Sequence, residues 1–162
     1  MSNLHDPSVI GRKAALLHWL VDRGYRVPPF VVVPVGADDL PEDVAAFLRP
    51  DRRYAVRSSS PVEDAADRSF AGQFATVLDV PGEPGAIAEA VAVVAASGRS
   101  DRIDAYRGNR DDEVPVAAIV QELVPAVVSG VAFSRNPTTG LVVRRSAGEI
   151  PETQSYIDIT DR

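Results

Sequence analysis

With 162 residues, 45% of them hydrophobic, the chain can bury a core without disulfides, and none can form because it has no cysteine. The formal charge of -6 argues against a general affinity for nucleic acid or anionic membranes, so any anion-binding site must be local. No apolar run reaches the roughly 20 residues of a membrane span, and the N-terminus lacks the basic start and apolar core of a secretory signal. We therefore expect a soluble, cytoplasmic protein.

The first predicted element is a helix over residues 8–23, because apolar residues recur there at helical spacing and Gly24 can end it. The next elements in chain order are a strand at 27–35, a short helix at 40–49, and short strands at 53–58 and 76–80. The last two strands flank a long polar loop. We expect them to pair with each other.

After the turn PGEPG the sequence becomes helical and then β-rich. Helices are predicted at 86–97 and 100–108, and strands at 114–123, 127–135, 141–146 and 154–160. Helices and strands mix without strict alternation, which favours an α+β fold over a doubly wound sheet. We expect a single domain over 1–162, with an N-terminal part to about residue 110 and a β-rich part from about 111.

The polar loop follows a short strand in the sequence AVRSSSPVEDAADRSFAGQFATVL, residues 55–78. Arg57 can make paired hydrogen bonds to phosphoryl oxygens, and Ser58 with the two serines after it can add donors. Gly72 would let the backbone approach a ligand closely. The alternative is a solvated loop in which Arg57 pairs with Glu63 or Asp64, and composition alone leaves both interpretations open.

Two further segments have the same chemical character. Gly11-Arg12-Lys13 lies at the start of the first helix, where backbone donors and an ammonium group could meet an anion, unless it is simply a solvated basic face. Gln121-Glu122-Leu123 could offer alternating carbonyl and N–H groups to an adenine edge, or could belong to an ordinary hairpin. No P-loop or dinucleotide-binding glycine motif occurs in the sequence.

Taken in order, several short stretches resemble the N-terminal ATP-binding domain of the family that contains phosphoenolpyruvate synthase, pyruvate phosphate dikinase and rifampin phosphotransferase. The similar stretches are IGRKAALL, RVPPFVVV, YAVRSSSPVED, SFAGQFATVLDV, IVQELV and SGVAFSRNPTTG. Each is weak alone, but the ordered set spans about residues 10–140 and is specific. The resemblance implies an ATP-grasp fold, in which two α+β lobes enclose ATP and magnesium.

The resemblance also implies roles for particular residues. Lys13 and Arg57 would contact phosphates, and Gly72 and Thr76 would lie along the triphosphate. The adenine hinge would be formed by Gln121, Glu122 and Leu123. On this interpretation the polar loop grips phosphate, and the cofactors are ATP and Mg²⁺.

The chain also departs from the family pattern. Only about 20 residues separate RVPPFVVV from YAVRSS, where relatives usually carry a longer helical insertion. The glycine-rich segment, the second lobe with a Gln-x-Arg-Pro pattern and the histidine-bearing swivelling domain have no match here. Glu149, Glu152 and Asp158 could replace the missing magnesium ligands, although carboxylates near a chain end more often face solvent. His5 and His18 match no family motif, and we interpret His18 as structural.

Three functions therefore remain. The chain could be the ATP-binding part of a dikinase-type phosphotransferase that needs a second polypeptide or further domains for turnover, because half of a phosphoryl-transfer site supplies only part of the stabilisation. It could instead be a free-standing, non-catalytic nucleotide-binding module, or a protein-interaction module that has lost the nucleotide. The retained Lys13, Arg57, Gly72 and Thr76 favour the first two.

Overall fold

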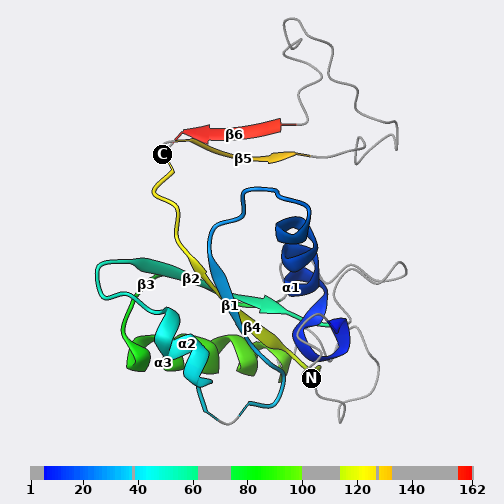
Figure 1. Cartoon of the computed structure of the whole chain (residues 1–162), viewed down its shortest axis with the longest axis vertical. Helices are drawn as coiled ribbons and strands as arrows, with labels where there is room; N and C mark the ends of the chain where they lie inside the picture. The colour runs from blue at the N-terminus through cyan, green and yellow to red at the C-terminus, as the bar shows by residue number, and fades with distance from the viewer. Residues whose placement is uncertain are drawn as a thin grey trace, which may run out of the picture. The chain divides into compact units, whose positions relative to one another are not determined.

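The computed structural model describes residues 6–37, 39–61, 74–99, 114–126, 128–132 and 157–161 (Figure 1). The chain divides into two compact units, Met1–Leu123 and Val124–Arg162. In the described part of the second unit, β5 (Val128–Ala132) pairs antiparallel with β6 (Ile157–Asp161). The predicted helix at 100–108 and the strand at 141–146 lie outside the described residues.

A four-stranded antiparallel sheet, in the order β1-β4-β2-β3, forms the centre of the first unit. Its strands are β1 (Phe30–Val33), β2 (Arg53–Ser59), β3 (Thr76–Pro81) and β4 (Ala117–Glu122). The predicted pairing of the two strands that flank the polar loop is confirmed, with Arg57 opposite Thr76. The predicted α+β class is also confirmed.

Helices cover both faces of this sheet. The first helix, α1 (Pro7–Asp22), packs on one face, and α2 (Glu42–Phe47) and α3 (Pro84–Ala96) pack on the other (Figure 1). A short 3-10 turn, Ser97–Arg99, follows α3. Among the described residues, no helix combines the length and the hydrophobicity that crossing a bilayer requires.

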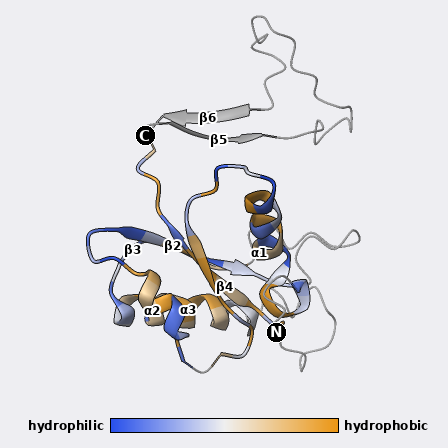
Figure 2. Cartoon of the chain, in the orientation of Figure 1, coloured by the Kyte–Doolittle hydropathy of each residue, from blue (hydrophilic) through white to orange (hydrophobic). Residues whose placement is uncertain are grey.

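The sheet separates two hydrophobic clusters. The larger one lies on the α3 face and includes Tyr54, Val56 and Val120, together with Ile87 of α3. The smaller one, on the α1 face, joins Ile10 and Ala14 to Ile119, with Phe30 and Val32 packed against it. Figure 2 shows mostly hydrophobic colour along α3 and along β1 and β4. Alternate residues of each strand therefore belong to opposite faces.

Local sequence signals explain both ends of α1. Asp6 caps its start, because a side-chain oxygen of Asp6 accepts a hydrogen bond from the Ser8 amide at 2.9 Å. Gly24 ends it as predicted, with φ +77° and with its amide donating to the Val21 carbonyl oxygen. The helix is not continuous, however, since Gly11 has φ 75° and ψ 166° and interrupts it. The sequence pattern did not predict this break.

Candidate functional site

Three predicted site residues lie on the α1 face of the sheet. Arg57 of β2 is opposite Thr76 of β3, and Gln121 of β4 is opposite Ala55 of β2. Gln121 is also opposite Phe30, which packs in the small cluster under α1. Side chains two residues apart on a strand share a face, so the sheet brings Arg57, Thr76 and Gln121 together.

A hydrogen bond connects two of these residues. Nη1 of Arg57 donates to Oε1 of Gln121 at 3.4 Å, and Nε2 of Gln121 donates to the Pro28 carbonyl oxygen at 3.2 Å. Gln121 is only 8% exposed, whereas Arg57 is half-buried. The amide of Gln121 therefore holds the guanidinium against the sheet. The alternative partners, Glu63 and Asp64, lie outside the described residues.

The backbone around Lys13 is tied to the end of β2. The Arg12 amide donates to the Ser60 carbonyl oxygen at 3.2 Å, and the Ala14 amide donates to Oγ of Ser59 at 3.0 Å. Lys13 lies between these two amides and is itself half-buried. Both acceptors follow Arg57 within three residues along the chain. Hydrogen bonds therefore connect the backbone that carries Lys13 to the strand that carries Arg57, the other predicted phosphate-binding cation.

Ser58 occupies a different position from Arg57. It is 1% exposed and, by the alternation of β2, lies on the α3 face with Val56. The structure therefore does not bring its hydroxyl to the face that carries Arg57. Gly72 lies outside the described residues, so its predicted role stays a prediction.

The predicted adenine hinge ends the last strand of the first unit. The Glu122 amide donates to the Pro29 carbonyl oxygen at 2.9 Å, and the Leu123 amide donates to the Arg53 carbonyl oxygen at 2.8 Å. The Glu122 carboxylate also forms an ion pair with Arg52, at 2.7 Å. Both amides therefore already donate within the protein, whereas the sequence interpretation expects N–H groups here to be offered to an adenine edge.

A second ion pair lies at the same end of β2, which begins at Arg53. Arg53 donates to both carboxylate oxygens of Asp79, at 2.8 and 3.0 Å. This hydrogen bonding, with the attraction between the charges, holds the pKa of Asp79 below its ordinary value of 3.8. Asp79 sits at an irregularity in the pairing of β2 with β3 and has φ 60°. Arg53 therefore has a carboxylate partner, whereas the bond made by Arg57 goes to a neutral amide.

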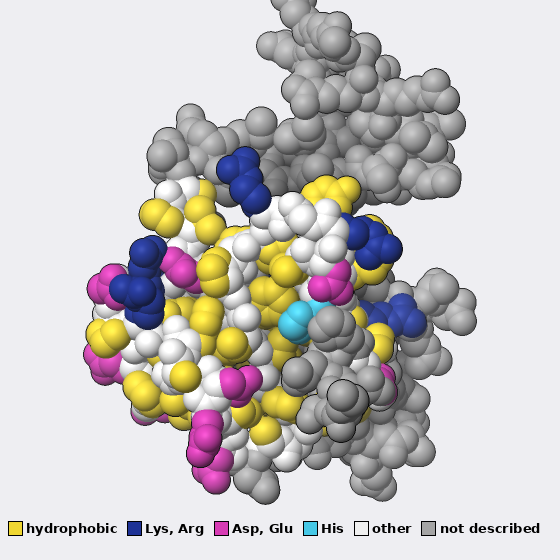
Figure 3. Space-filling model, in the orientation of Figure 1, with side chains coloured by type: hydrophobic (Ala, Val, Ile, Leu, Met, Phe, Trp, Pro, Cys, Tyr) yellow, Lys and Arg dark blue, Asp and Glu magenta, His cyan; other side chains and the backbone are white. Residues whose placement is uncertain are grey.

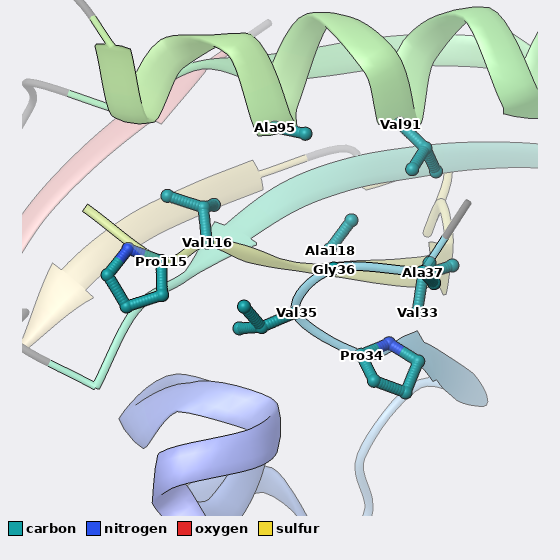
Figure 4. Close-up of a pocket in the computed structure, with 10 residues that line it drawn as sticks. All are labelled: Val33, Pro34, Val35, Gly36, Ala37, Val91, Ala95, Pro115, Val116 and Ala118. Carbon is teal, nitrogen blue, oxygen red and sulfur yellow. The ribbon is translucent and has the colours of Figure 1, made fainter. Parts of the chain in front are cut away.

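A cavity among the described residues lies away from this cluster. It has a volume of about 530 Å³ and is bounded by α3, the segment after β1 and the start of β4 (Figure 4). Its lining residues are Val33, Pro34, Val35, Gly36, Ala37, Val91, Ala95, Pro115, Val116 and Ala118. None of these has a polar side chain, and Val33 and Ala118 belong to the α3-face cluster. The cavity therefore offers no side chain that could hold phosphate.

Charged side chains in the described part of the chain do not form a metal centre. No group of three or more His, Cys, Asp or Glu residues gathers among the described residues. Glu149 and Glu152 lie outside them, and only the strand pairing of Asp158, with Val131, is described. Basic side chains are spread over separate places on the face seen in Figure 3.

Two contributors to this geometry were missed by the sequence interpretation. Ser59 was grouped with the phosphate donors, yet its hydroxyl accepts a hydrogen bond from α1. Gly11 is grouped in the sequence with Arg12 and Lys13 as a possible anion-binding helix start, and that pattern does not indicate a break in the helix. The positive φ of Gly11 interrupts the helix. A glycine within a helical pattern is the sequence signal that could have indicated this interruption.

Comparison with known proteins defines the class of this domain. Residues 39–152 match the family described as pyruvate phosphate dikinase, AMP/ATP-binding domain. A rifampicin phosphotransferase from Streptomyces is 39% identical over 116 residues, which cover 65% of this chain and 13% of that protein. The phosphoenolpyruvate synthase of Aeropyrum pernix is 44% identical over 91 residues, covering 54% of this chain and 11% of that protein.

A third relative is an uncharacterized phosphotransferase from Bacillus subtilis, 36% identical over 105 residues, with 63% of this chain and 12% of that protein covered. The fold and these similarities define a dikinase-type ATP-binding domain. The chain belongs to the pyruvate phosphate dikinase AMP/ATP-binding domain family. It spans only about an eighth of the length of the curated relatives that it matches.

Proposed function

We propose that this chain binds ATP on the α1 face of its sheet and serves as the nucleotide-binding part of a dikinase-type phosphotransferase. The observation that carries the proposal is the Arg57–Gln121 hydrogen bond. It holds a half-buried guanidinium on the face that also carries Thr76, and its acceptor is a neutral amide. Among the described residues no carboxylate forms an ion pair with Arg57, so within this part of the chain its positive charge stays available to phosphate.

The phosphates would be bound from two sides. Arg57 would make paired hydrogen bonds to phosphoryl oxygens, and the ammonium group of Lys13 would act as a second positive charge. Thr76, exposed at the start of β3, would add a hydroxyl along the triphosphate, and Gly72 would bring backbone amides to it. We include Ser58 only through its backbone, because its side chain is buried on the other face.

The adenine base would lie at Gln121, Glu122 and Leu123. Its exocyclic amino group would donate to a carbonyl oxygen there, since the amides of Glu122 and Leu123 already donate within the protein. Apolar side chains near the end of β4 would contact the ring faces. This arrangement places the purine end and the phosphate end of the nucleotide on neighbouring strands, joined by Gln121.

Turnover would require more than the described residues provide. We propose an ATP-grasp arrangement in which both units of the chain contribute to one domain, and in which a second lobe and a swivelling histidine domain come from other sequence or from a partner polypeptide. The small fraction of each relative that the chain covers supports this. Because no carboxylate cluster lies among the described residues, the proposal assigns magnesium no ligand there.

Calorimetric titration with ATP, with adenosine as the comparison ligand, tests the proposal. We expect ATP to bind with a dissociation constant near the millimolar range and more tightly than adenosine, because only ATP carries phosphates for Arg57 and Lys13. Absence of both heat and thermal stabilisation at several millimolar ATP would overturn the proposal. The interaction-module alternative, which the comparisons do not favour, would then be the remaining hypothesis.

A further inference from the structure

The interruption of α1 leaves a helix start without its own capping side chain. The helical segment that contains Lys13 begins immediately after Gly11, whose φ is 75° and ψ 166°. At such a start, the side chain of the preceding residue usually accepts a hydrogen bond from an amide two or three residues later. Glycine has no side chain for this. The amide in question, that of Ala14, donates to Oγ of Ser59 at 3.0 Å in a buried contact.

Ser59 can reach this amide because Gly11 lets the two backbones approach closely. A Cβ placed on Gly11 would lie 2.3 Å from the carbonyl carbon of Ser59 and 2.4 Å from its Oγ. Gly11 is buried, and Ser59 is 0% exposed. The Arg12 amide adds a second hydrogen bond, to the Ser60 carbonyl oxygen. The amides on either side of Lys13 are thus hydrogen-bonded to the last residue of β2 and to the residue that follows it.

We infer that Ser59 is a positioning residue for phosphate binding: it caps the helix start from the neighbouring strand and so fixes Lys13 relative to Arg57. The inference rests on the proposed function, since it concerns how that site is assembled. Arg57 and Ser59 are two residues apart on β2 and share the α1 face. Strand β2 carries Arg57, and its Ser59 caps the turn that carries Lys13. This strand therefore sets the spacing between the two cations.

Ser60 offers a matched control. It is also 0% exposed, and its Oγ makes a hydrogen bond of the same length, 3.0 Å, but to the Pro115 carbonyl oxygen instead of α1. Although the sequence suggests Ser60 as a phosphate donor, its hydroxyl is buried and donates within the protein, so we do not include it in the proposed site. Ser60→Ala therefore removes a buried hydroxyl and a hydrogen bond while leaving the cap intact. The backbone carbonyl of residue 60, which accepts from Arg12, is retained in this variant. A difference between the two serine variants reports on the contact with α1.

Calorimetry on the full chain compares ATP and adenosine for Ser59→Ala, Ser60→Ala and the unchanged sequence. We expect Ser59→Ala to weaken ATP by on the order of tenfold while adenosine changes little, and Ser60→Ala to affect both ligands equally or not at all. If Ser59 acts through Lys13, Ser59→Ala loses no further ATP affinity in a Lys13→Ala background. Additive losses, or equal behaviour of the two serine variants, would overturn the inference while leaving ATP binding itself intact.

A second measurement keeps the inference testable if Ser59→Ala folds poorly or if ATP binds weakly. Amide hydrogen exchange without nucleotide reports directly on the Ala14 N–H. We expect it to be protected in the unchanged chain and in Ser60→Ala, and to exchange faster in Ser59→Cys, whose sulfur is a weaker acceptor. Rapid, unprotected exchange of the Ala14 amide in the unchanged chain would show that Ser59 does not cap this helix start, whatever the measured ATP affinity. Failure of the unchanged chain to bind ATP would overturn the proposed function and this inference with it.

Discussion

Arg57 of β2 and Gln121 of β4 are diagonal neighbours on the α1 face of the sheet, with Nη1 of Arg57 donating to Oε1 of Gln121 at 3.4 Å. The Gln121 side chain is anchored at its other end to the Pro28 carbonyl oxygen. A neutral, buried amide thus determines where a positive charge lies.

Arg57→Ala should weaken ATP binding by about 1.5–3 kcal/mol, the range for a lost charge-assisted hydrogen bond. Adenosine affinity and the melting temperature without ligand should change little, because Arg57 is half-buried and water can replace it beside Gln121. Arg53→Ala is the control, since Arg53 lies on the same strand but pairs with Asp79. Calorimetry on both variants provides the measurement. Equal loss of ATP and adenosine affinity in Arg57→Ala would assign Arg57 to the scaffold.

Gln121→Met should lower the free energy of unfolding by about 0.5–1.5 kcal/mol, because the half-buried Pro28 carbonyl loses its donor. It should also weaken ATP, because the Arg57 guanidinium loses its fixed position. Methionine has a similar length and flexibility, so little cavity is created. Urea denaturation followed by ATP titration measures both effects. Unchanged stability would show that the Pro28 contact contributes nothing.

Gly11→Ala should destabilise the fold by about 2–5 kcal/mol, combining the cost of positive φ with forced separation from Ser59. Gly24→Ala is a matched control, because Gly24 has φ +77° but no atom within 4 Å of the added methyl group. Its cost should be only about 1–2 kcal/mol. Thermal or urea unfolding measures the stability of both variants, and the difference between their losses gives the cost of the close contact between Gly11 and Ser59. Similar losses at both positions would argue against the tight packing of Gly11 on β2.

Asp79→Asn should remove part of the acid sensitivity of the fold. The pKa of the Asp79 carboxyl is lowered by hydrogen bonding to Arg53 and by its charge, so its contribution is present above the ordinary value of 3.8 and is lost as pH falls through the lowered pKa. Asparagine also tolerates the positive φ at this position. Stability should fall less steeply below about pH 4 in the variant, which should also be less stable at pH 7 by the same amount, a small one because the ion pair is exposed. Urea unfolding at a series of pH values measures this effect. The same loss of stability below about pH 4 in the variant and the unchanged chain would contradict the prediction.

Local signals in the sequence were enough to predict most elements of the first unit. Gly24 ends α1 as predicted, and the strands on either side of the polar loop pair as predicted. The insertion of β4 between β1 and β2 depends on contacts between residues far apart in the chain, which no local pattern encodes. For the same reason the link between Arg57 and Gln121 could not be foreseen.

The side-chain orientation within β2, in contrast, follows from local sequence. Arg57 and Ser58 are adjacent in the sequence, and grouping them as one phosphate-binding set overlooked the alternation of a strand, which sends neighbours to opposite faces. Burial of Tyr54 and Val56 with Ser58 on the α3 face follows from the same alternation. This part of the error could have been avoided from the sequence alone.

The central position of β4 also has consequences for how the domain folds. Within the described residues β1 pairs with β4, and β4 in turn pairs with β2, so the N-terminal strand enters the sheet only through a segment almost 90 residues later. Such long-range closure is entropically expensive and typically slows folding. During synthesis, β2 and β3 could pair early as a local unit, whereas β1 would wait until residues 117–122 had left the ribosome. A nascent chain shorter than this should expose the unpaired backbone edge of β2 that β4 later covers.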